Sequence, residues 1–70
     1  MSVILALGKV LGPSAAKLIF DALQQKKNGP SRIEKATELV ESGASAISAL
    51  QQTFGRDFLE TLSSALTSKS

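Results

Sequence analysis

The sequence has no cysteine, histidine, tryptophan or tyrosine among its 70 residues. Without cysteine it forms no disulfide bond and carries no thiol chemistry, and without either cysteine or histidine it lacks the usual ligands of zinc. A hydrolytic triad has no base, and no glycine-rich loop followed by lysine is present to bind phosphate. We therefore expect a protein that is not an enzyme and that binds no metal or cofactor.

A chain of this length forms one domain at most. Domains of about 60 residues bury only ~60% of the surface that the unfolded chain exposes, and natural chains of this size often add disulfides, a metal or a partner. The first two are not expected here, whereas 43% of the residues are hydrophobic. We therefore expect a partner surface to cover the apolar helix faces.

Turn residues divide the chain into helical segments, and no strand-like alternation is present. The clearest boundary is Asn-Gly-Pro-Ser at 28–31, where Gly29 is expected to stop one helix and Ser31 to form a capping box with Glu34 at the start of the next. Gly-Pro-Ser at 12–14 predicts a kink or a tight turn. The predicted elements are an apolar amino-terminal segment 1–12, a helix 13–27, a long helix 31–54, a short helix 56–67 and a tail 68–70.

The long helix is predicted because one apolar seam keeps its phase throughout the segment. The small residues at 42–46 leave two interpretations open: close approach of another helix at Gly43, or a break at which Ser45 caps a second helix. We favour the single helix because the seam continues past Gly43. The seam residues are Ile33, Ala36, Val40, Gly43, Ile47, Leu50 and Phe54.

The amino-terminal segment is apolar around most of its circumference, with Val3, Leu7 and Val10 on one helical face. We expect this face and the seam to meet a partner, whereas the phenylalanines are expected to anchor the core. The predicted partner interface consists of Val3, Leu7, Val10, Ile33, Ala36, Val40, Gly43, Ile47, Leu50 and Phe54; the expected core anchors are Phe20, Phe54 and Phe58.

Charge is unevenly distributed, although the net charge is only +2. Residues 1–27 carry four lysines against one aspartate, and residues 28–55 carry three glutamates against one arginine and one lysine. We interpret the lysines as a solubilising fringe rather than an anion-binding stripe, and the glutamates as a solvated helix face rather than paired carboxylates. These residues are Lys9, Lys17, Lys26 and Lys27, and Glu34, Glu38 and Glu41.

The sequence therefore predicts an all-α fold, a small hairpin or bundle of three or four helices that is completed by oligomerisation or by a partner. The expected function is a protein–protein interaction or assembly module, either in a homo-oligomer or as a small structural or accessory subunit of a larger protein complex, such as a viral or phage particle. No basic region precedes the first apolar stretch, as it does in a secretory signal, so we expect a cytoplasmic or particle-associated protein.

Two alternatives stay open. Residues 1–23 are a possible membrane-surface segment: their apolar stretch is almost long enough to cross a bilayer, but Lys9, Lys17 and the Gly12-Pro13 break favour an interfacial helix over a span. This arrangement is similar to that of amphipathic bacteriocins and small phage lysis proteins, with no motif specific to either. A weaker alternative is a helix-turn-helix DNA-binding protein whose reader helix is 45–54. That helix has no lysine or arginine, so we do not expect nucleic acid as a partner.

Overall fold

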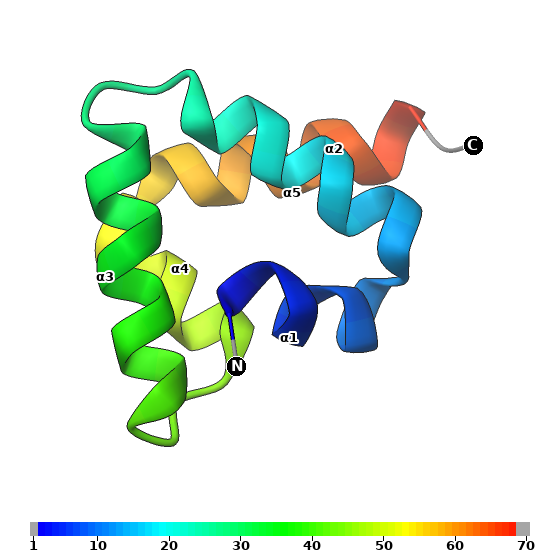
Figure 1. Cartoon of the computed structure of the whole chain (residues 1–70). Coiled ribbons are helices and arrows are strands. Elements are labelled where there is room, and N and C mark those ends of the chain that lie inside the picture. The colour runs from blue at the N-terminus through cyan, green and yellow to red at the C-terminus, as the bar shows by residue number, and fades with distance from the viewer. Residues whose placement is uncertain (1, 69–70) are drawn as a thin grey trace.

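A computed structural model of the chain describes residues 2–68, which form five helices and no strand (Figure 1). In chain order they are α1 (Val3–Leu11), α2 (Pro13–Gln24), α3 (Gly29–Glu41), α4 (Ala46–Phe54) and α5 (Arg56–Ser68). The all-α fold class is confirmed, but the described residues contain more helices than the expected three or four. Residues 69–70 of the predicted tail, like residue 1, lie outside the described residues.

Each link between consecutive helices contains one residue at positive φ. These residues are Gly12 (φ 93°), Asn28 (φ 57°), Gly43 (φ 110°) and Gly55 (φ 60°). Glycine has no Cβ, and asparagine tolerates the left-handed region better than most residues, so both permit backbone conformations that are costly for other side chains. The four links therefore allow five short helices to fold back on one another.

The predicted single helix over 31–54 is wrong, because that segment contains α3 and α4. α3 ends in a Schellman motif, in which the Gly43 N–H donates to the Val40 carbonyl and the Ala44 N–H donates to the Leu39 carbonyl, each at 3.0 Å. Gly43 is exposed, and a Cβ at this position would meet nothing within 4 Å. It therefore ends a helix and does not provide a close contact between helices.

Serine side chains cap two of the helices. At the start of α4 the Ser45 hydroxyl accepts a hydrogen bond from the Ser48 N–H at 3.1 Å, and at the start of α1 the Ser2 hydroxyl accepts one from the Leu5 N–H at 3.4 Å. Each cap satisfies one of the backbone donors that the first helical turn leaves unpaired. The cap at Ser45 confirms the second interpretation of the small residues at 42–46, a break between two helices, which the apolar periodicity did not favour.

The turn between α2 and α3 differs in detail from the prediction. Asn28, not Gly29, adopts the left-handed conformation, and α3 already begins at Gly29, so Ser31 lies within the helix and the predicted capping box does not form. Gly29 is buried, and a Cβ there would collide with the Leu23 carbonyl and lie 2.6 Å from the carbonyl oxygen of Gln24. Glycine is therefore needed at this position for close backbone approach.

The helices enclose one core of small and branched apolar side chains. Figure 1 shows α2 and α5 side by side, α3 crossing at one end, and α1 near α4. A hydrogen bond of 3.2 Å from the Val3 N–H to the Thr37 hydroxyl joins α1 to α3. The buried members of the core are Val3, Leu7, Ala16, Ile19, Leu23, Ala36, Ala46, Ala49, Leu50, Phe54, Phe58 and Ala65.

One polar contact supports the corner between α3, α4 and α5. The Arg32 guanidinium lies 5.5 Å from the centre of the Phe54 ring and 3.7 Å from the Asp57 carboxylate. Both charged side chains are more than a third exposed, so water screens the ion pair and it contributes at most about 1 kcal/mol. Apolar packing therefore provides most of the stability of this corner.

We predict that Gly29→Ala lowers the free energy of unfolding by about 1–3 kcal/mol, because its methyl group forces the backbone of α2 and α3 apart. Gly8→Ala is the matched control: its Cβ would lie 3.9 Å from the Ala16 Cβ, an ordinary contact, so this variant keeps or slightly gains stability. Urea denaturation of the two variants and the wild type measures the difference. Equal stability of both variants would show that the α2–α3 contact is looser than described.

Candidate functional site

Most of the predicted partner interface lies in the chain's own core. Side chains from α1, α3 and α4 that were expected to meet a partner instead pack against one another. Five of them are buried and three are partly buried against the core: Val3, Leu7, Ala36, Leu50 and Phe54 in the first group, and Ile33, Val40 and Ile47 in the second. In this fold these residues do not form a separate exposed surface.

The two remaining interface residues, Val10 and Gly43, lie outside the core. Val10 is 60% exposed, in contrast to Val3 and Leu7 on the same predicted face. Figure 1 shows the second half of α1 running away from α3 and α4, which leaves the last turn of α1 without their cover. Gly43 lies in the exposed link between α3 and α4. Val10 and Gly43 are therefore the two predicted interface residues that stay exposed.

An apolar groove of about 780 Å³ lies between α1 and α2. Its volume falls within the range of ~300–1,000 Å³ that is typical of binding pockets in proteins. We call it the α1–α2 groove, and its lining residues are Ile4, Leu5, Gly8, Lys9, Pro13, Ala16, Lys17, Phe20 and Asp21.

Small residues between larger ones create this groove. Gly8 and Ala16 face each other, because a Cβ on Gly8 would lie 3.9 Å from the Ala16 Cβ. Leu5 and Phe20 are larger side chains that line the same groove, and Leu5 is 62% exposed. The single-residue link at Gly12 keeps α1 and α2 next to each other. The result is an apolar hollow between two helices, with an exposed leucine beside it.

Three charged side chains also line the α1–α2 groove: Lys9, Lys17 and Asp21. All three are exposed, and none of the ion pairs recorded for residues 2–68 involves them. Together they give the groove a formal charge of +1. The groove therefore combines an apolar lining with solvated charges of both signs, mainly positive.

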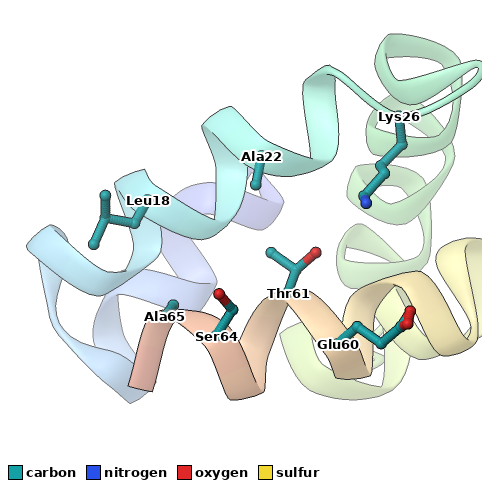
Figure 2. Close-up of a pocket in the computed structure, with 7 residues that line it drawn as sticks. All are labelled: Leu18, Ala22, Lys26, Glu60, Thr61, Ser64 and Ala65. Carbon is teal, nitrogen blue, oxygen red and sulfur yellow. The ribbon is translucent and has the colours of Figure 1, made fainter. Parts of the chain in front are cut away.

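A second hollow of about 500 Å³ lies between α2 and α5 (Figure 2). We call it the α2–α5 cleft. In Figure 2 Lys26 extends toward α5 from the turn that follows α2, and Thr61 and Ser64 extend from α5 toward α2. No hydrogen bond recorded within the described part of the chain joins two polar side chains of the cleft. Its lining residues are Leu18, Ala22, Lys26, Glu60, Thr61, Ser64 and Ala65.

The acidic residues of α3 and the predicted DNA-reading helix form no organised site in the described residues. Glu34, Glu38 and Glu41 are exposed on α3, and no group of three or more acidic side chains in residues 2–68 is placed to hold a metal ion. The helix expected at 45–54 is α4, which exposes Gln51 but carries neither lysine nor arginine. The α1–α2 groove is therefore the best candidate site.

Sequence reasoning did not find the α1–α2 groove. It placed Phe20 in the core with Phe54 and Phe58; these two are buried, but Phe20 is only half-buried and lines the groove. The sequence did contain a signal for the groove, because each of the two helices carries apolar residues outside its buried face. In α1 Leu5 follows Ile4, and in α2 Phe20 comes four residues after Ala16.

Comparison with known proteins gives no match to this chain among protein-family models, curated proteins or solved structures. Within residues 2–68 no helix is both long and apolar enough to cross a membrane.

Proposed function

We propose that this chain is a non-enzymatic helical interaction and assembly module whose contact surface is the α1–α2 groove. It acts in a homo-oligomer or as a small structural or accessory subunit of a larger protein complex. The observation that carries the proposal is Leu5, which is 62% exposed beside an apolar groove although the core is already closed without it. A partner that fills the groove removes this side chain from water.

The solvent-accessible area of the folded chain supports the view that the core and the contact surface consist of different residues. The accessible area is 4312 Å² for a chain of 7.3 kDa, close to the roughly 4,200 Å² expected for a compact monomer of that mass. One copy therefore covers its own core, and association is not required to bury the seam. The apolar residues that stay exposed are left for a contact.

Covering the groove is energetically favourable. Burial of a fully exposed leucine or phenylalanine side chain stabilises by about 1.5–3 kcal/mol. Leu5 and the half-buried Phe20 each supply part of that amount, while Gly8 and Ala16 leave space for a partner side chain. The lysines stay at the edge of such a contact and remain solvated, as charged residues do at the rim of protein interfaces.

We predict that light scattering in buffer shows an average mass that rises above 7.3 kDa as the protein concentration increases. Leu5→Ser lowers this association without loss of helicity, because Leu5 is outside the core. Val10→Ser is the matched control, since Val10 lies on the same helix, is 60% exposed and does not line the groove. A monomeric wild type at every concentration, or equal losses in both variants, would contradict self-association through the groove.

A second candidate function is binding to the surface of a membrane. It is favoured by the outer side of α1, where Leu5 and Val10 are about 60% exposed and Lys9 is exposed near them. Lys9 lies between Leu5 and Val10 around the helix, and exposed apolar side chains beside a lysine suit the boundary between acyl chains and anionic headgroups. Because Leu5 and Val10 are far apart around the helix, a surface that covers both is broader than one that only fills the α1–α2 groove.

Flotation with vesicles distinguishes this candidate from the first. The assembly proposal predicts that the protein stays in the unbound fraction with both neutral and anionic vesicles. A membrane-surface protein instead floats with the anionic vesicles, and Val10→Ser lowers its recovery as much as Leu5→Ser does.

A further inference from the structure

α5 carries a second exposed apolar surface. Leu59 and Leu66 are 49% and 50% exposed. They are seven residues apart in one helix, which places them about 10.5 Å apart along the axis and within about 20° of each other around it. Ser63 lies between them on the same side and is also exposed. We call Leu59, Ser63 and Leu66 the α5 ridge.

The α5 ridge and the α1–α2 groove belong to separate parts of the molecule. Thr61 and Ser64 line the α2–α5 cleft (Figure 2), about 180° around α5 from the two exposed leucines, so the ridge faces away from α2. The groove lies where α2 packs on α1, and α1 does not contact α5 in the described residues. The ridge therefore does not reach the groove of its own chain, whereas two copies can make this contact.

The two halves of the chain carry opposite charge. Residues 2–27 contain four lysines and one aspartate, a net charge of +3. Residues 28–70 contain five acidic and four basic side chains, a net charge of −1. Such a difference steers the basic half of one copy toward the acidic half of another and disfavours the approach of two basic halves.

The charges next to the α5 ridge and the α1–α2 groove also favour contact between these two surfaces. Glu60 and Arg56 are exposed on one flank of the α5 ridge, and Lys9, Lys17 and Asp21 are exposed along the groove. A ridge docked in the groove offers a lysine to Glu60 and an aspartate to Arg56. A contact between two grooves would instead bring four lysines together with only two aspartates, so like charges would dominate it.

We infer that the α5 ridge of one copy docks in the α1–α2 groove of a second copy. The inference rests on the proposed function and names the chain itself as the partner. A helix whose exposed leucines enter a groove between two helices is a common mode of recognition. Because two different surfaces meet, a pair of copies still has one free groove and one free ridge, and assembly continues until a ring closes or a filament grows.

Mixing two complementary variants tests this contact. Leu5→Lys blocks the groove and Leu66→Lys blocks the ridge, and both side chains are at least half exposed, so both variants keep the wild-type fold by circular dichroism. We predict that each variant alone is monomeric in light scattering. An equimolar mixture forms particles of twice the monomer mass and no larger, because the intact ridge of the first variant fits the intact groove of the second.

Leu18→Lys is the matched control, since Leu18 is 54% exposed and belongs to neither surface; this variant assembles like the wild type. If Leu5→Lys or Leu66→Lys loses helicity, the double variant Lys9→Glu with Lys17→Glu replaces the first and Leu59→Lys replaces the second.

Each contrary result overturns the inference in a recognisable way. A mixture that stays monomeric excludes contact between ridge and groove. A groove variant that still dimerises indicates contact between two ridges, and a ridge variant that still dimerises indicates contact between two grooves; in both cases the proposed function survives. A monomeric wild type contradicts the self-assembling form of the proposed function as well.

Discussion

The structure depends on changes of chain direction at four residues of positive φ: Gly12, Asn28, Gly43 and Gly55. The helices between them have 9 to 13 residues, and isolated helices of that length are marginal in water. Each helix is therefore stabilised mainly by the core that it shares with the others. A left-handed conformation costs an ordinary residue roughly 1–2 kcal/mol. The shared core therefore requires glycine or asparagine in these links.

The four links also decide which apolar residues are left for function. Because α3 and α4 are separate helices, the seam that runs through both folds back into the core and is closed by α1 and α5. Alanines at several buried positions let the short helices approach closely. Three of the large apolar side chains that stay exposed are on other faces: Leu5 lines the α1–α2 groove, and Leu59 and Leu66 form the α5 ridge. These faces, and not the seam, are the basis of the proposed assembly.

The sequence predicted the class of the fold better than its connections. Helical periodicity identified apolar faces correctly, as Leu7 and Leu50 show, because burial follows the pattern whichever helix supplies the cover. It missed the break at Gly43, since the phase of the seam is the same on both sides of the turn. It also placed Val10 on one face with Val3 and Leu7, which are buried, whereas Val10 is exposed. The exposure of Val10 depends on the direction in which α1 leaves α3 and α4, and periodicity within one helix carries no information about that direction.

The central claim is that one copy closes its own core and associates only through exposed side chains. Leucine methyl signals followed by NMR from dilute to concentrated solution test it most directly. The account predicts that the signals of Leu5, Leu59 and Leu66 shift with concentration while those of the buried Leu7, Leu23 and Leu50 stay constant. Concentration-dependent shifts of the buried leucines would contradict the account, because they would show that a second copy completes the core.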